Sequence, residues 1–246
     1  MEKKFNIESI RMQLDYEYNV LAEYLDLDVE MLRNDSIITG GCIPDMYNGL
    51  KPNDIDFFIM TESCKNEIIK AISKKGFFLI DTKSAKGGVM ISSGGNKDSV
   101  YVTDKAITLF NDLGLARHQL IFTKVGSKSP YDVVEDFDFS LVCHYIHKGV
   151  ITCPYTDIGS RTLHIKGSIP NPIDTLMRVS KYVLKGYSVS SEFFSNFLNE
   201  YVVKLEEAEC IKISPVKYVE FNDNRDTIAT KKYIFKEDDY LEISGK

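Results

Sequence analysis

Two aspartates lie inside an apolar run, and this feature restricts most strongly how the chain can fold. The run reads DIDFFIM from Asp54 to Met60. Successive side chains of a strand point to opposite faces, so Asp54 and Asp56 project together while Ile55 and Phe57 face a core. An unpaired buried charge is costly. The two carboxylates therefore require solvent, a cation or a metal ion.

A pair of glycines precedes this strand. Residues 36–39 form a short apolar strand that Gly40 and Gly41 end, and a polar loop leads on to the aspartates. Glycine lacks a side chain, so backbone N–H groups can approach an anion there. Together the two pieces predict a triphosphate cradle beside carboxylate ligands for Mg²⁺ or Mn²⁺, because these ions prefer oxygen. Each piece alone has a simpler interpretation, a tight turn for the glycines and a strand end paired with lysine for the aspartates.

Helical and strand patterns occupy most of the chain. Apolar residues at steps of three and four predict helices over residues 7–26, 28–34, 61–76, 129–137 and 138–146. Runs of β-branched and aromatic residues predict strands over 77–83, 89–93, 99–103, 106–110 and 118–124. From Pro170 onward helical periods dominate, and the last 31 residues, 216–246, alternate enough for a strand or two. We expect an α/β (α+β) chain with a small mixed sheet flanked by helices in residues 1–155, and a mainly helical part in residues 156–246.

Composition narrows the setting and the partners. The 246 residues carry a formal net charge of -6, which argues against coating nucleic acid through net charge and leaves a local basic face open. Five cysteines without a repeated spacing, and no signal-peptide pattern, favour a reducing, cytoplasmic setting. No run approaches the roughly 20 apolar residues of a spanning helix, so no membrane partner is expected. Composition makes no prediction of oligomeric state.

The order of strand, Gly-Gly, loop and Asp-x-Asp strand resembles the DNA polymerase β-like nucleotidyltransferase superfamily. Within it the chain is most similar to tRNA nucleotidyltransferases of the CCA-adding and poly(A) polymerase type, which have G-G-x-x-R-D at this place. GGCIPD keeps Gly40, Gly41 and Asp45 but has Pro44 in place of arginine. The resemblance implies a nucleotidyltransferase fold for this part of the chain.

Two later segments follow the same family order. DFDFS keeps Asp138 of that type's R-R-D-F-T but has Asp136 and Phe137 in place of the two arginines. The strand that usually supplies a third carboxylate has Gln119 where an acid is expected. Asp138 or Asp136 can serve instead, and we favour Asp138, in a role nearer the nucleotide ribose than the metal. The segment NPIDTLMRVSKYVLKGYSV echoes the family's D-P-x-R-x-L-R-x-x-R-F segment.

The resemblance implies transfer of a nucleoside monophosphate from a nucleoside triphosphate to an acceptor hydroxyl, most of all at the 3′ end of a tRNA-like RNA. Asp54 and Asp56 would hold the metal, and Gly40 and Gly41 the triphosphate tail. Two alternatives stay open. One is a catalytically silent member that senses nucleotides or binds proteins, and the other is a toxin–antitoxin or defence-type enzyme that modifies tRNA or a protein.

Three basic residues recur on the predicted helix that follows Pro172. Arg178, Lys181 and Lys185 are spaced as i, i+3 and i+7, and the apolar residues of the other side are Leu176, Val179 and Val183. We expect the basic stripe to face outward. It would bind a triphosphate or an RNA backbone, or else be an ordinary solvated helix face.

One cluster of possible metal ligands lies in the predicted helix 138–146 and just beyond it. Cys143, His144, His147 and Cys153 would include two histidines on one helical face. The spacing matches no closed structural zinc pattern, so buried residues are favoured over a zinc site.

Overall fold

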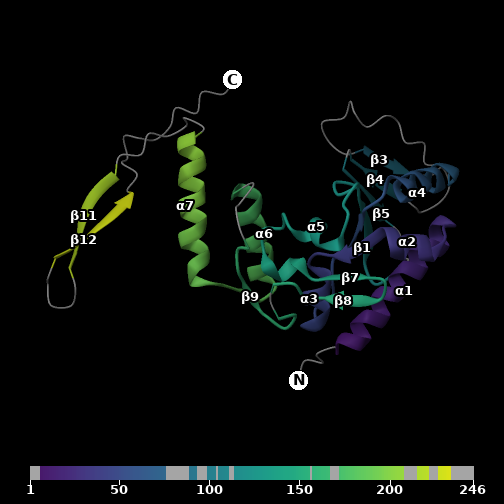
Figure 1. Cartoon of the computed structure of the whole chain (residues 1–246), viewed down its shortest axis with the longest axis horizontal. Coiled ribbons are helices and arrows are strands. Elements are labelled where there is room, and N and C mark those ends of the chain that lie inside the picture. Colours follow the sequence, from purple (N-terminus) through teal and green to yellow (C-terminus); the bar gives the residue numbers. More distant parts are fainter. Residues whose placement is uncertain are drawn as a thin grey trace.

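The computed structural model describes residues 6–75, 89–92, 99–103, 105–110, 114–155, 157–166, 172–207, 215–221 and 227–233. The helices are α1 (Ile7–Leu25), α2 (Val29–Asp35), α3 (Cys42–Tyr47), α4 (Glu62–Lys74), α5 (Pro130–Val134), α6 (Pro172–Leu184) and α7 (Ser191–Glu207) (Figure 1). The strands are β1 (Ser36–Thr39), β2 (Asp54–Ile59), β3 (Val89–Ser92), β4 (Ser99–Val102), β5 (Ala106–Phe110), β6 (Arg117–Ile121), β7 (Tyr145–His147), β8 (Val150–Thr152), β9 (Thr162–Leu163), β10 (Ser188–Val189), β11 (Pro215–Phe221) and β12 (Thr227–Tyr233). The predicted strand at 77–83 lies outside the described residues.

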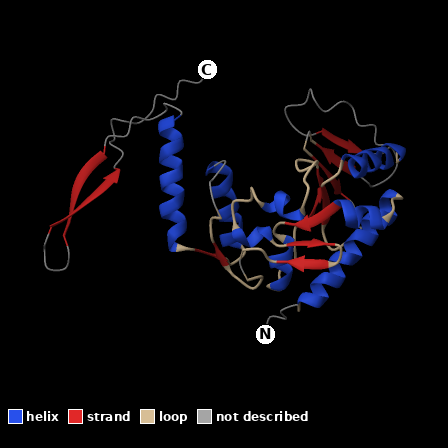
Figure 2. Cartoon of the chain, viewed as in Figure 1, coloured by secondary structure: helices blue, strands red, loops and turns tan. Residues whose placement is uncertain are grey.

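Eight strands form one mixed sheet in the order β3-β4-β5-β6-β2-β1-β7-β8. Figure 2 colours the strands red and the helices that lie beside them blue. Only the β2–β6 pair is parallel within this sheet, and each other neighbouring pair is antiparallel. The register places Asp56 of β2 between Thr39 of β1 and Gln119 of β6. The end of β1, where the diglycine follows, therefore lies beside the Asp-x-Asp strand. The predicted mixed sheet flanked by helices is confirmed.

The main core lies between this sheet and the helices α1, α2 and α4. Along β2 the odd-numbered residues Ile55, Phe57 and Ile59 are fully buried, as the alternation predicts. Tyr18 of α1 meets the Phe57 ring edge-on, with 5.3 Å between ring centroids. This packing fixes the opposite face of β2, so both aspartates project away from α1.

Side-chain caps set the ends of the predicted helices. Asn6 accepts a hydrogen bond from the Ser9 N–H at the start of α1, and Thr61 caps α4 in the same way. Ser129 and Asp132 form a reciprocal capping box at α5. Each cap satisfies an N–H group that the first turn leaves without a partner. No helix among the described residues is long and apolar enough to cross a membrane.

A second apolar cluster surrounds α6 and the first turns of α7. Phe139 stacks on Phe193 at 6.1 Å and meets Tyr182 edge-on at 6.3 Å. The short parallel pair β9–β10 borders this cluster through Leu163. The mainly helical C-terminal part thus packs on residues that follow α5, and a boundary after residue 155 stays a prediction.

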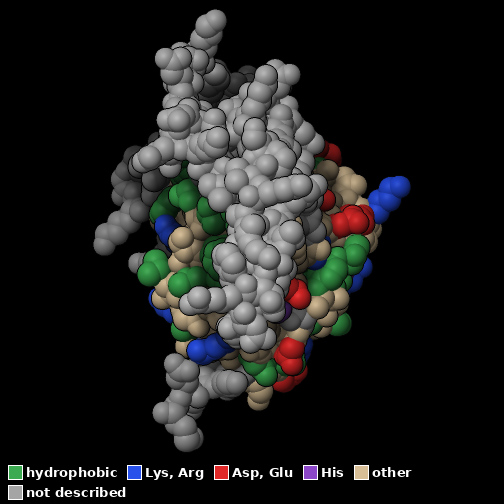
Figure 3. Space-filling model, turned by 90° about the vertical axis from the view of Figure 1, so that its left-hand side faces the viewer, with side chains coloured by type: hydrophobic (Ala, Val, Ile, Leu, Met, Phe, Trp, Pro, Cys, Tyr) green, Lys and Arg blue, Asp and Glu red, His purple; other side chains and the backbone are tan. Residues whose placement is uncertain are grey.

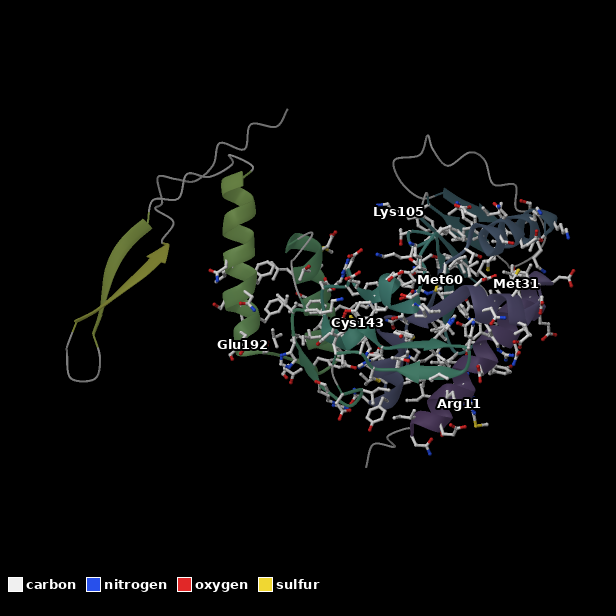
Figure 4. The ribbon with its side chains drawn as sticks, in the orientation of Figure 1. Arg11, Met31, Met60, Lys105, Cys143 and Glu192 are labelled. Carbon is white, nitrogen blue, oxygen red and sulfur yellow. The ribbon has the colours of Figure 1, made fainter. Side chains whose placement is uncertain are left out.

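The predicted helix over residues 138–146 is wrong. A single 3-10 turn covers Ser140–Cys143, and the chain then joins the sheet as β7. Ile146 pairs with Ile38 of β1, so the edge of the sheet supplies hydrogen bonds that a helix would have had to make internally. His144 and His147 therefore share no helical face. Cys143 lies in the interior, near Met60 in Figure 4, in an apolar cluster.

Candidate active site

Residues from both parts of the chain meet in one cavity of about 430 Å³ between β2 and α6. Its walls come from the β1–α3 turn, β2, the segment after α5, and α6. All eight candidate residues of the sequence analysis line it: Gly40, Gly41, Asp54, Asp56, Asp138, Arg178, Lys181 and Lys185. The structure thus brings together residues that are up to 145 positions apart, from Gly40 to Lys185.

Asp54 and Asp56 have different surroundings although they share one face of β2. The Asp54 Oδ1 atom lies 2.9 Å from Nη2 of Arg117. Asp56 Oδ1 is buried and has no hydrogen-bond partner in the part of the chain that the structure describes. Burial first, and the charge of Asp54 second, raise the pKa of Asp56 to about 7, while Lys181 acts in the opposite direction. A carboxylate whose buried oxygen has no hydrogen-bond partner can be stabilised by binding a proton or a cation.

Gly40 gives the Asp56 carboxylate its space. It adopts a φ of +92°, and a β-carbon built on it would lie 2.9 Å from Asp56 Oδ2. Its own N–H donates to the Val142 carbonyl at 3.2 Å, so this N–H is not free for an anion. A β-carbon on Gly41 would lie 2.7 Å from the Tyr182 hydroxyl. The two glycines therefore allow close approach, of a carboxylate at one position and of α6 at the next.

The three basic residues of the predicted stripe, two on α6 and Lys185 directly after it, line the cavity with different partners. Lys185 forms an ion pair with Asp45, which is 1% exposed. Arg178 Nη1 lies 2.8 Å from Asp138 Oδ2. Lys181 forms no ion pair with any described residue. Lys181 is thus the cation of α6 that is free to meet a ligand, and the other two hold carboxylates of the cavity wall.

The basic stripe is accessible, in agreement with its predicted outward direction: Arg178 is 55% exposed, Lys181 is exposed and Lys185 is half-buried. The side of α6 that faces the cavity and the second cluster carries the basic residues together with Val179 and Tyr182. Leu176 and Val183, which the helical period puts on an apolar face, are 41% and 48% exposed. Figure 3 views the molecule from the α7 side and shows hydrophobic side chains at the surface there. The periodicity thus identifies the basic residues of this helix correctly, but it does not predict that Leu176 and Val183 stay exposed.

Asp138 is buried in the wall of the cavity. Its Oδ2 atom accepts hydrogen bonds from the Thr175 hydroxyl at 3.1 Å and from Arg178. Its Oδ1 atom is buried and makes no hydrogen bond with the described residues. α6 therefore holds this carboxylate in place and leaves one of its oxygens for a ligand.

The strand next to β2 supplies an amide where a third carboxylate was sought. Gln119 pairs with Asp56 in the parallel register, and its amide donates to the Thr108 hydroxyl at 3.3 Å. No cluster of three or more Asp, Glu, His or Cys side chains that could hold a metal ion occurs in the described ranges. A divalent cation would thus be held by Asp54 and Asp56, with water and substrate phosphate completing its shell.

The far end of the cavity, along β2, is lined by aromatic and charged side chains. Phe58 lies against Phe137 with 5.4 Å between ring centroids. Lys124 Nζ lies 2.5 Å from Asp136 Oδ2. This end of the cavity therefore combines two aromatic rings with a carboxylate–ammonium pair.

Sequence reasoning missed two charged groups of the interior. Asp45 is quoted with the diglycine motif without a role, yet it bonds to Lys185 and accepts from the Tyr187 hydroxyl at 3.3 Å. Glu17 of α1 lies 2.8 Å from His118 Nε2, and both side chains are at most 1% exposed. An acid on the apolar side of the 7–26 pattern, between Leu14 and Leu21, was the signal for the second.

Comparisons with known proteins identify a family. The Gabija anti-defense 2 family profile matches residues 15–152, which is more than half of the chain. Gabija anti-defense 2 of Bacillus phage SPbetaL7 is 29% identical over 193 residues, covering 74% of this chain and 42% of the relative. The chain therefore spans less than half the length of that relative.

Solved structures of CCA-adding enzymes are similar to the chain at low identity. A CCA-adding enzyme in complex with ATP is 14% identical with a TM-score of 0.49, and the match covers 82% of this chain and 45% of that enzyme. The Thermotoga maritima CCA-adding enzyme complexed with tRNA is 14% identical with a TM-score of 0.48, over 83% of this chain and 44% of that enzyme.

Proposed function

We propose, since the chain belongs to the Gabija anti-defense 2 family, that it counters Gabija defence by metal-dependent nucleotidyl transfer at the cavity between β2 and α6. The observation that carries the proposal is the pair of unmatched charges in that cavity. Among the described residues, the buried Oδ1 atom of Asp56 has no hydrogen-bond partner and Lys181 has no ion pair, whereas the other charged groups of the wall are paired. A metal–triphosphate complex supplies both missing charges.

Each residue has a separate task in this proposal. Asp54 and Asp56 hold a divalent cation, which when bound neutralises charge on the phosphates. Lys181 binds the triphosphate, and Gly40 keeps the space beside Asp56 open. Asp138, fixed by Arg178, accepts a hydrogen bond from the ribose at its free Oδ1. These contacts hold the nucleotide for attack at its α-phosphorus.

The reaction is a displacement at the α-phosphorus. The oxygen of an acceptor hydroxyl forms a bond to phosphorus, the bond from phosphorus to the pyrophosphate oxygen breaks, and the hydroxyl proton passes to solvent. The acceptor we favour is an RNA 3′ end, which the motif resemblance implies. The side chains of this cavity supply orientation and charge, which is where most catalysis of phosphoryl transfer arises.

One observation favours a second function, nucleotide binding without transfer. Arg117 forms an ion pair with Asp54, which a metal ion would have to displace. Gln119 lies beside Asp56, where a third carboxylate would assist the acceptor. A protein of this kind would bind a nucleoside triphosphate through Lys181 and Asp56 and release it unchanged. Opposition to a defence system by capture of a nucleotide is compatible with the same cavity.

A transfer assay separates the two functions. The protein is incubated with Mg²⁺ or Mn²⁺, each α-labelled nucleoside triphosphate and total RNA, and pyrophosphate release and labelled RNA are measured. Wild type should transfer label, Asp56→Asn should not, and Lys181→Gln should transfer at least about tenfold more slowly. Lys70→Gln, an exposed lysine of α4, is the matched control and should behave as wild type.

Calorimetry with the same nucleotides completes the test. Binding without transfer by wild type would select the second function. Transfer that is unchanged in Asp56→Asn would refute the assignment of this cavity. In cells that carry Gabija, the chain should restore phage growth, and the Asp56→Asn variant should not.

A further inference from the structure

Two phenylalanines offer an aromatic surface at one end of the cavity. Phe58 follows Asp56 by two residues, so it projects from the same face of β2 about 7 Å further along the strand. Its ring lies 5.4 Å from that of Phe137 at an interplanar angle of 51°. Both rings are only partly buried and line the cavity. An aromatic surface one step beyond the carboxylates suits the stacking of a base whose phosphates lie at Asp56.

A carboxylate and an ammonium group stand at the edge of this surface. Asp136 directly precedes Phe137, and Lys124 Nζ is bonded to Asp136 Oδ2 at 2.5 Å and to the Asp132 carbonyl at 3.4 Å. An ammonium group has three N–H donors, so one of them remains for a ligand. Asp136 Oδ1 accepts no hydrogen bond from a described residue, and the Asp136 side chain is 72% exposed. The pair therefore presents two acceptor oxygens beside one donor.

Guanine is the base whose Watson–Crick edge matches this arrangement. Its N1–H and N2–H point the same way and can both donate to one carboxylate, while its O6 accepts from an ammonium group. Adenine and cytosine present one amino group beside an acceptor nitrogen. Uracil presents a single N–H between two carbonyls. Each of these three bases can give a carboxylate only one hydrogen bond from that edge.

We propose that Phe58, Phe137, Asp136 and Lys124 form a nucleobase subsite that selects a guanine nucleotide. The proposal rests on the proposed function, because it requires a nucleoside triphosphate in this cavity. It also gives a role to the residues that replace the two arginines of the similar nucleotidyltransferases. The paired carboxylate and ammonium discriminate between bases, which two arginines in their place could not do in the same way, since arginine only donates.

Equilibrium binding measures the selection directly. Calorimetry with Mg²⁺ and GTP, ATP, CTP, UTP or ITP, without an acceptor, should show GTP bound at least about tenfold more tightly than the next of the four common nucleotides. ITP lacks the 2-amino group and can give the carboxylate only one hydrogen bond. Its affinity should therefore be lower than that of GTP, and at least as high as that of the weaker nucleotides. Asp136→Asn should remove the advantage of GTP over ATP, and Glu135→Gln, the exposed neighbour outside the cavity, should keep it.

The failures of the two proposals are distinguishable. Equal affinities for the four nucleotides, or a preference for another base, overturn the guanine subsite and leave the proposed function standing. Binding of none of them overturns the proposed function and the subsite with it. A GTP preference that survives in Asp136→Asn, with an unchanged melting temperature as proof of folding, overturns the assignment to Asp136.

Discussion

Replacement of Asp56 by asparagine tests whether the cavity holds a carboxylate at a cost to stability. Burial, then the charge of Asp54, raise the pKa of Asp56 to about 7, whereas an aspartate of an unfolded chain has a pKa of about 4. When the folded pKa is the higher one, stability is complete below the unfolded pKa and is lost as the pH rises through the folded pKa. Roughly three pH units at about 1.4 kcal/mol each give a ceiling of about 4 kcal/mol.

Asparagine keeps the shape of the side chain and removes its charge. We therefore expect Asp56→Asn to raise the free energy of unfolding by about 4 kcal/mol at most at pH 8, and by about 1–2 kcal/mol at pH 5, where only the unfolded state is ionised. Urea unfolding at both pH values in EDTA measures the two increments. Mg²⁺ with a nucleotide should then stabilise wild type more than the variant at pH 8.

The comparison variant is Asp54→Asn, which removes both the partner of Arg117 and the charge that helps to raise the pKa of Asp56, so it should stabilise the fold less than Asp56→Asn does. An Asp56→Asn increment that is the same at pH 5 and pH 8 would refute the raised pKa. So would a carbon NMR titration of the Asp56 carboxyl with a midpoint near pH 4. Either result would mean that the carboxylate is solvated in the folded protein and needs no cation.

Three further stability predictions concern backbone space and buried charge. Gly40→Ala should lower the free energy of unfolding more than Gly126→Ala, since both glycines have φ near +90° but only at Gly40 would the added β-carbon meet an atom within 3 Å. We expect a loss of roughly 1 kcal/mol at Gly126 from backbone strain alone and of roughly 2–3 kcal/mol at Gly40. Equal losses in urea unfolding would contradict the crowding at Gly40. Lys185→Gln should cost roughly 3–5 kcal/mol because it leaves the buried Asp45 without its cation and with only the Tyr187 hydroxyl as a partner, and an unchanged melting temperature would contradict this expectation. Burial raises the pKa of Glu17 but its hydrogen bonds lower it more, so the stability that the Glu17 carboxylate contributes is lost as the pH falls. Glu17→Gln should therefore lower the free energy of unfolding by roughly 3 kcal/mol at pH 7 and by less at pH 4. A loss of the same size at both pH values would contradict the lowered pKa.

The sequence predicts the local structure of the site well because local rules govern it. The period of two along β2 fixes which face carries Asp54 and Asp56, and the buried Ile55 and Phe57 confirm it. The apolar strand followed by Gly-Gly predicts a turn that needs no side chain, and Gly40 adopts a positive φ there. Helix starts follow from capping residues, as at α5. These features depend on neighbours within a few positions, so the chain order alone contains them.

The partners of each charge depend on packing between distant segments, and no local rule supplies them. Lys185 meets Asp45 across 140 positions, and Arg178 meets Asp138 across 40. The segment after Asp138 has a helical pattern yet extends into β7, because the free edge of β1 offers it hydrogen bonds. A helical period shows which residues share a face of α6, and only the position of the sheet decides that this face closes a cavity. The sequence by itself determined the two carboxylates and the diglycine. The tertiary structure decided that Lys181 and Asp56 line the same cavity and that neither has an ion pair among the described residues, because ion pairing depends on distances in space and not along the chain.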